Sequence, residues 1–163
     1  MKKIIILFIV MFSCTSMKAG EKDQFFNINA GFLFPNTLNA SVGYEMELKY
    51  GNAIELSGEV GNRWHKEDGK IYKDTFFDDY YWDGSLIYKK RLAKDKNSSF
   101  RLRIGMQFGA HTGDYMFGAE GGFEYNYTFD GGVQLSLIQK NQVNFLHGDT
   151  FKNGLLVGIK IPF

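Results

Sequence analysis

Cysteine is almost absent from this sequence, since Cys14 is the only one among 163 residues. A disulfide framework is therefore excluded. A strong excess of charge is missing too: the formal net charge is +1, so nothing indicates nucleic-acid binding. Long apolar runs are also missing, because Ile4–Phe12 is shorter than the about 20 residues that a membrane-spanning helix needs. If the exported chain is integral to a membrane, it must cross as a β-barrel.

The N-terminus has the layout of a secretory signal peptide. Two lysines precede the apolar run, and small and polar residues follow it. We expect residues 1–19 to be this signal and residues 20–163 to be a single outer-membrane barrel domain. The cleavage site stays open, although a cut after Ser16 fits better than a cut after Ala19. Cys14 is either a small residue near the cleavage site or a lipidation site after type II cleavage.

Residues 38–50, LNASVGYEMELKY, alternate between two kinds of side chain: even positions are apolar or aromatic, and odd positions are small or polar. A period of two is typical of a β-strand. Strands of about ten residues suit a membrane crossing, whereas ordinary strands average about five or six. The pattern predicts an all-β fold, an eight-stranded antiparallel transmembrane β-barrel of the outer-membrane type. Its eight expected strands are 26–34, 38–50, 54–65, 80–89, 100–111, 117–129, 133–140 and 155–163.

The connections between these strands differ in length. GN at 51–52 and DG at 130–131 are tight hairpin signals, and the third connection on the same side is LAKDKNSS at 92–99. The opposite side has longer loops, of which 65–79 and 141–153 are the longest. With eight strands both termini fall on the periplasmic side, so this asymmetry is the one expected of outer-membrane barrels.

Aromatic residues gather at the two ends of the expected strands. Rings at both edges of an aliphatic band are typical of membrane interfaces. A soluble, lipocalin-like barrel is the alternative, but its core has no reason to sort aromatics by height. The chain also ends in IKIPF, like the C-terminal sorting signal of outer-membrane proteins. The expected periplasmic belt is Phe26, Tyr50, Tyr88, Phe100, Tyr127, Phe129 and Phe163, and the expected outer belt is Phe34, Trp64, Tyr80 and Phe117.

The other face of the strands carries charge in balance. An eight-stranded barrel has an interior that side chains fill, so we expect these groups to neutralise one another and leave no open pore. Lys49 is expected opposite Glu55, and Arg103 near Glu124. A conducting channel is the alternative. The expected inward charges are Glu45, Glu47, Glu55, Glu59, Asp83, Glu120 and Glu124, with Lys49, Arg63, Lys89, Arg101, Arg103, Lys140 and Lys160.

Inward glycines and outer-rim polar groups complete the pattern. The glycines give room to long cations and let the sheet coil; they are Gly105, Gly109, Gly118, Gly122 and Gly158. The rim groups suggest either a metal site or an acid–base pair, or simply polar loops in water; they are His65, His111, His147, Asp78, Asp79, Asp114 and Asp149. Ser136 and Ser57 are not placed to complete a lipid-modifying site. We therefore predict no enzyme and no catalytic, cofactor-binding or metal residues.

Loop 65–79 is the most suggestive outer segment. Its DG at 68–69 favours a hairpin above the membrane, and an exposed aromatic β-edge binds proteins by strand addition. A folded-over or disordered surface loop is the alternative. We expect outer-membrane lipid around a monomeric barrel, and envelope protein partners at this loop.

Three runs resemble the conjugal transfer TraO family of Bacteroidota: NINAGF at 27–32, SLIYKKRLAKDKNSSFRLRIGMQFGAHTG at 85–113 and GDTFKNGLLVGIKIPF at 148–163. The resemblance implies a component of an envelope-spanning DNA-transfer apparatus and brings no catalytic residues with it. The alternatives are an adhesin or stress-protective barrel that acts through its outer loops, and a rim-located hydrolase.

Overall fold

The computed structural model describes residues 24–64, 66–67, 70–71, 79–145 and 151–163. The expected signal 1–19 and Cys14 lie outside these residues. The described part of the chain holds no helix long and apolar enough to cross a membrane. Its main strands are β1 (Gln24–Phe34), β2 (Thr37–Glu47), β3 (Ala53–Arg63), β6 (Tyr80–Lys94), β7 (Ser98–His111), β8 (Asp114–Thr128), β9 (Gln134–Asn144) and β10 (Phe151–Pro162).

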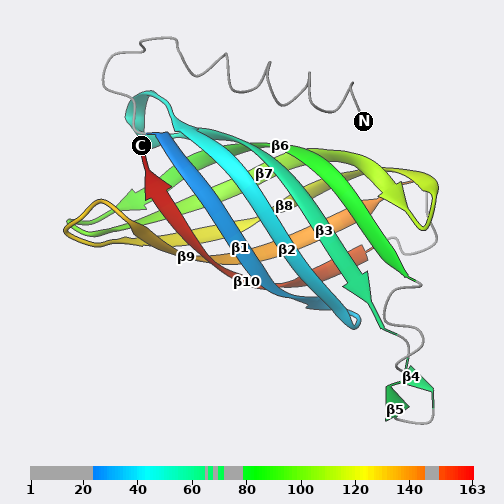
Figure 1. Ribbon diagram of the computed structural model, residues 1–163. Helices are drawn as coiled ribbons and strands as arrows, with labels where there is room; N and C mark the ends of the chain where they lie inside the picture. Colours follow the sequence, from blue (N-terminus) through cyan, green and yellow to red (C-terminus); the bar gives the residue numbers. More distant parts are fainter. Residues whose placement is uncertain (1–23, 65, 68–69, 72–78, 146–150) are drawn as a thin grey trace.

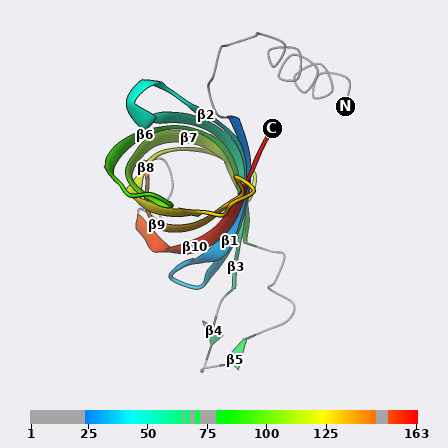
Figure 2. The ribbon, with the colours of Figure 1, turned by 90° about the vertical axis from the view of Figure 1, so that its left-hand side faces the viewer.

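These eight strands close into a barrel in the order β1-β10-β9-β8-β7-β6-β3-β2, and the end-on view shows the closed ring (Figure 2). Each strand pairs antiparallel with both neighbours, and β1 pairs with β10. Following cross-strand partners once around from Phe34 leads back to β1 at Gln24, ten residues away. Such a stagger belongs to barrels whose strands tilt by about 35–45° from the axis. The predicted eight-stranded antiparallel barrel is confirmed.

Side chains alternate between the lumen and the outer surface along every strand. On β1, Asn27 and Asn29 are buried while Phe26 and Ile28 are exposed. The exposed set consists of large apolar residues that a soluble protein would bury, among them Val42, Leu56, Leu86, Ile104, Met106, Leu137, Val157 and Ile159. The buried set is mostly polar and charged. This arrangement is the reverse of a soluble barrel and matches a barrel surrounded by lipid.

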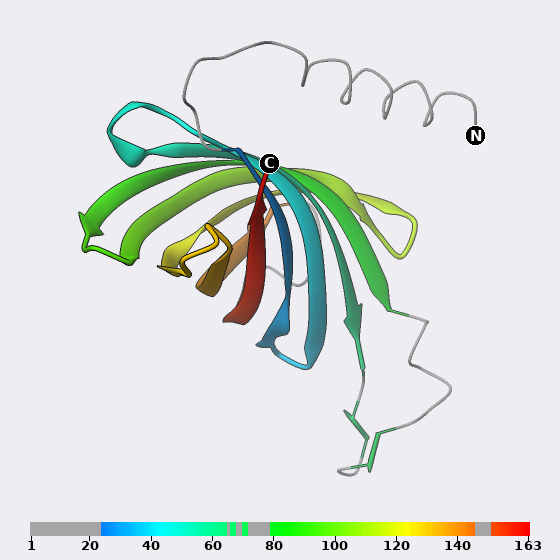
Figure 3. The same ribbon diagram turned by 60° about the vertical axis from the view of Figure 1, so that its left-hand side comes forward.

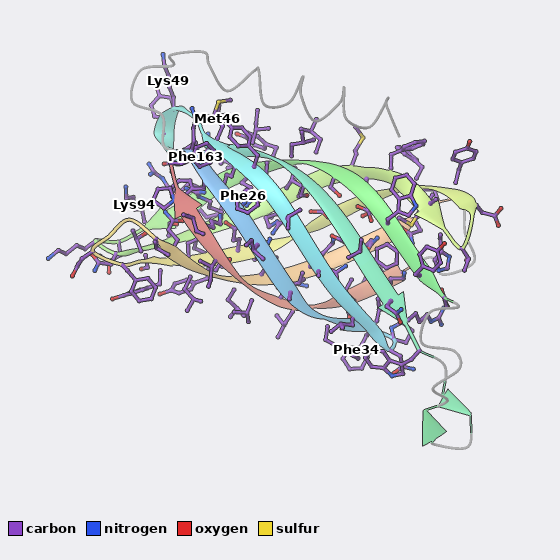
Figure 4. All side chains as sticks on the ribbon, viewed as in Figure 1. Phe26, Phe34, Met46, Lys49, Lys94 and Phe163 are labelled. Atoms are coloured by element: carbon purple, nitrogen blue, oxygen red, sulfur yellow. The ribbon has the colours of Figure 1, made fainter. Side chains whose placement is uncertain are left out.

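The barrel has two distinct ends. β1 begins and β10 ends at one of them, which we name the inner end; β1 turns into β2 at the other, the outer end (Figure 1). Phe26 and Phe163 lie toward the inner end and Phe34 at the outer end (Figure 4). Aromatic rings meet at both: Tyr127 and Phe129 are 5.2 Å apart between centroids at the inner end, while Phe32 contacts Phe34 and Trp64 at the outer end. The names follow the expectation that the termini face the periplasm.

Three connections are shorter than predicted. β6 and β7 run through most of LAKDKNSS and leave only residues 95–97 between them, β8 begins at Asp114 within the expected loop 112–116, and β9 continues to Asn144. The apolar alternation ends where the strands leave the apolar band. The backbone hydrogen bonds continue, because a strand still needs a partner for its amides. In these strands, sequence alternation therefore marks the lipid-facing part and misses the end beyond it.

A short hairpin extends beyond β3 at the outer end (Figure 3). It consists of β4 (Lys66–Glu67) and β5 (Lys70–Ile71), which pair antiparallel. At the inner end the β2–β3 turn contains a 3₁₀ turn, η2 (Lys49–Gly51). Tyr50 there has a positive φ of 65°, which a turn this tight imposes.

The five inward glycines are explained by neighbouring backbone as well as by lumen space. A Cβ on Gly109 would strike the carbonyl oxygen of Trp82 on β6, and one on Gly122 would strike that of Gln139 on β9. Close approach between strands lets a narrow barrel coil, and only glycine permits it. The predicted inward orientation is confirmed for all five glycines.

Candidate functional site

The lumen contains a dense group of charges near the inner end, which we name the inner ion cluster: Glu45, Glu55, Glu124, Lys89, Lys160, Arg101 and Arg103. Lys89 lies at its centre. Its Nζ is 2.5 Å from Glu45 Oε2, 2.5 Å from Glu55 Oε2 and 2.6 Å from Glu124 Oε2. One ammonium group thus joins carboxylates of β2, β3 and β8, so three strands are held through a single side chain.

Further cations surround the same carboxylates. Lys160 on β10 binds Glu45 at 2.7 Å and also contacts Glu124. Arg101 donates to Glu45 at 2.6 Å and to the half-buried Glu47 at 2.9 Å. Arg103 reaches Glu124 at 3.4 Å, which confirms that predicted pair. Buried charges with several opposite partners are compensated, whereas a single unpaired one is costly.

A second group, the outer ion cluster, lies nearer the outer end than the first. It comprises Glu59, Asp83, Glu120 and Lys140. Lys140 on β9 contacts Glu59 on β3 and lies 3.0 Å from Glu120. β9 and β3 are four strands apart in a ring of eight, so they form opposite walls. The Lys140–Glu59 pair therefore crosses the lumen, as a packed interior requires.

The carboxylates of Glu45, Glu55 and Glu124 have the spacing that a cation site would need, since ligand oxygens of all three lie within 4.8 Å of one another. The Lys89 ammonium already occupies the position between them. This makes the carboxylate triad part of the ion network, and lysine supplies the positive charge. The prediction of no metal residues stays a prediction.

The outer mouth of the lumen is lined by a different set of side chains. His111 Nε2 is 2.6 Å from Asp79 Oδ1, and the rings of His111 and Tyr81 are 6.4 Å apart. The Lys152 ammonium lies 4.1 Å from the centre of the Tyr81 ring, a cation–π contact. The Tyr81 hydroxyl donates to Glu59 at 3.1 Å, which links the mouth to the outer ion cluster.

The structure brings together part of the predicted rim set. His111 and Asp79 form a pair, and Asp114 is the cross-strand partner of His111. A His–Asp pair is one element of acid–base chemistry. Ser136 and Ser57, which we did not expect to complete a lipid-modifying site, both face the lumen. Ser136 donates to Asn29 at 3.4 Å, and Ser57 is the cross-strand partner of Ser85 in the middle of β3. The remaining rim residues lie outside the described residues: His65, His147, Asp78 and Asp149.

Lys49 is the clearest error among the predicted inward charges. It lies exposed in the η2 turn, and Glu55 has Glu45 as its cross-strand partner and Lys89 as its counter-ion. The alternation of residues 38–50 was extended too far, because β2 ends at Glu47. Arg63 is only half-buried and lies 3.9 Å from Asp79 at the mouth.

Sequence reasoning also missed several inward residues. Lys152 is 1 % exposed, yet it stands in a segment that was expected to be a loop. Leu33, Ile138 and Leu156 form an apolar cluster inside the barrel. Each stands at a position where the alternation of its strand places lumen-facing polar residues. The only available signal for its inward orientation was therefore its place in the alternation, counted from the strand end.

Comparison with known proteins identifies the fold and no family. No family model matches the chain, and no curated protein matches it. A major outer membrane protein from Thermus thermophilus superposes with a TM-score of 0.55 at 11% identity, covering 88% of this chain and 100% of the other. A de novo designed transmembrane β-barrel superposes with a TM-score of 0.51 at 10% identity, covering 89% of this chain and 100% of the other.

Fold and surface together define the class of this protein. It is a small transmembrane β-barrel of the outer-membrane type, with an apolar exterior, aromatic belts and a lumen filled by paired charges. Within that class, the resemblance to the TraO family rests on the sequence runs alone.

Proposed function

We propose that this protein is a closed outer-membrane barrel with a structural or interaction role, and that it does not conduct solutes. The ion network carries this proposal. Its side chains come from seven of the eight strands, and the Lys140–Glu59 pair crosses the lumen between opposite walls. A hydrated pore needs open space along the whole length of the lumen, and here salt-bridged side chains cross it from wall to wall.

Planar-bilayer recording tests the closed lumen. The wild-type barrel is expected to insert without steady conductance. The matched control replaces Glu59, Arg103 and Lys140 together by alanine, which removes the crossing side chains and is expected to give conducting steps. Retained gel mobility of the unboiled sample shows that the control still folds. Steady conductance from the wild type would contradict a closed lumen.

We further propose that the protein works through loop 65–79 as part of an envelope assembly. The support is the β4–β5 hairpin, in which Lys66 pairs with Ile71 and Glu67 with Lys70 beyond the barrel rim. A hairpin edge offers backbone groups for strand addition. The family resemblance suggests that the assembly is a conjugative DNA-transfer apparatus.

Deletion of residues 66–71 distinguishes a role in the envelope assembly from a role as an adhesin. Wild-type barrel purified from cells is expected to bring down proteins of the transfer apparatus, and the deletion variant is expected to lose them and to lower transfer frequency. A control deletion of residues 95–97, at the inner end, should leave both unchanged. Loss of cell adhesion with unchanged transfer frequency would favour an adhesin.

No catalytic role is proposed. The His111–Asp79 pair is the arrangement that a rim hydrolase would use. Lipid or peptide turnover that disappears in His111→Ala, with unchanged barrel folding, would overturn this position.

A further inference from the structure

The outward face of β9 contains two amides within an otherwise apolar stripe. Gln139 and Asn141 follow Leu135 and Leu137 on the outward face, and Val143 and Phe145 continue it. Both amide residues are half-buried. Polar side chains on the lipid face of a membrane protein are costly and tend to be functional.

The depth of these amides follows from their neighbours. The cross-strand partners of Gln139 are Phe123 on β8 and Leu155 on β10, both exposed and apolar. Toward the outer end of the same strand, the Phe145 ring contacts Phe117 of the outer aromatic belt at 5.8 Å. Leu137 lies on the inner side of the pair. The two amides therefore lie between an aliphatic residue and the outer belt, within the hydrocarbon band.

The hydrogen bonds of the two amides are incomplete. Gln139 Nε2 donates to Asn141 Oδ1 at 3.0 Å, and Asn141 Nδ2 donates to the Gly121 carbonyl at 3.3 Å and, weakly, to Gln139 Oε1 at 3.4 Å. Two primary amides have four N–H groups and four acceptor lone pairs. Contacts within the described residues use at most three of the four N–H groups, so at least one is left, and hydrocarbon offers it no partner.

Small residues flank the outer part of this surface on the β8 side. Gly121 is the cross-strand partner of Asn141, and Ala119 is that of Val143; a Cβ on Gly121 would make only an ordinary contact, 3.6 Å from the Arg103 carbonyl oxygen. Between transmembrane helices, small residues together with polar groups are typical of contact surfaces, and we apply the same reasoning to this barrel wall. The exposed Asn153, cross-strand partner of Asn141, extends the polar surface onto β10. We name Ala119, Gly121, Gln139, Asn141 and Asn153 the amide patch.

We infer that the amide patch is the contact surface between two copies of this chain, which form a twofold dimer in the membrane. The patch is uncharged and presents donors and acceptors on the same residues, so it is complementary to itself. A twofold contact pairs one surface with the same surface of its partner. The opposite wall, β3, presents only Ile54, Leu56, Gly58 and Val60 across the band. Because each barrel has one such polar wall, the assembly is limited to two copies. The sequence, by contrast, led us to expect a monomer.

Cysteine cross-linking in the outer membrane tests the dimer. Leu137→Cys, in a Cys14→Ser background, places a thiol on β9 beside the amides. A short bis-maleimide is expected to give covalent homodimers from it. Leu56→Cys is the matched control, since it is similarly exposed (41% against 47%) and lies on the opposite wall; it should give none.

A second variant tests the amides themselves. Gln139→Leu with Asn141→Leu, added to Leu137→Cys, is expected to lower the dimer yield about tenfold, because it removes the interchain hydrogen bonds. Gel mobility of the unboiled sample checks that it folds, and Gln139→Leu alone serves if the double variant does not.

Equal cross-linking at positions 137 and 56 would overturn the inference, since it would report random collision. An unchanged dimer yield without the amides would overturn it as well. Cross-linking of position 137 to a different protein only, identified by mass spectrometry, would overturn the dimer and show that the patch serves another membrane protein.

Discussion

The two faces of β7 show how one strand serves two opposite environments. Arg103 is 6% exposed in the lumen, and the next residue, Ile104, is 58% exposed on the outer surface. Inside, stability depends on each charge keeping its partners, because a buried unpaired charge is costly. Outside, it depends on the absence of charge, because lipid cannot solvate it. The lumen face is therefore sensitive to the loss of a charge, and the outer face is sensitive to the addition of one.

The largest effect is expected from breaking the lumen face at its centre. Lys89→Met leaves Glu45, Glu55 and Glu124 without the cation they share, and it should destabilise the barrel by about 3–5 kcal/mol. Urea unfolding in lipid vesicles, followed by gel mobility, measures the change. Lys94→Met, at the exposed end of β6, is the control, and its stability should stay within about 0.5 kcal/mol of the wild type. Equal stability of the two variants would show that the inner ion cluster contributes little.

The next effect comes from placing charge on the outer face. Ile104→Arg should cost about 2–4 kcal/mol, the depth-dependent penalty for arginine near the middle of a bilayer. Ile104→Leu controls for the change of shape and should be nearly neutral. The same unfolding assay applies. If Ile104→Arg were as stable as wild type, lipid would not cover this surface.

A smaller effect should separate an inward glycine from an outward one. Gly109→Ala drives a Cβ into the Trp82 carbonyl, and we expect a loss of about 1–3 kcal/mol in the same assay. Gly58 faces outward, and a methyl group added there would meet nothing within 4 Å, so Gly58→Ala should stay within about 0.5 kcal/mol. Similar losses in both would assign the cost to strand flexibility in general, and the close approach of β6 and β7 would lose its role.

Sequence reasoning succeeded where the two faces differ in polarity and failed where they do not. The expected strand 38–50 was correct along β2 and wrong at Lys49, because the alternation continues by chance into the turn. It missed Lys152 for the opposite reason: hydrophilic residues around it resemble a loop, although the backbone is paired as β10. The amides Gln139 and Asn141 interrupt the apolar alternation, so the expected strand ends at residue 140 and leaves Asn141 in the loop, whereas β9 continues to Asn144.

The ion partners were the hardest feature to predict. Arg103 and Glu124 lie on adjacent strands, so a hairpin register suffices to bring them together, and that pair was predicted. Lys140 and Glu59 lie on opposite walls, and their contact depends on how far the strands are staggered around the whole ring. No local pattern carries that information.

The sequence alone determined which face of each strand is charged and which is apolar, since a period of two follows directly from the pleat of a β-strand. It also determined that the molecule must close, because eight such strands in lipid leave no tolerable edge. Only the tertiary structure decided which charges meet across the lumen, because the stagger of the closed barrel sets the height of every residue in it.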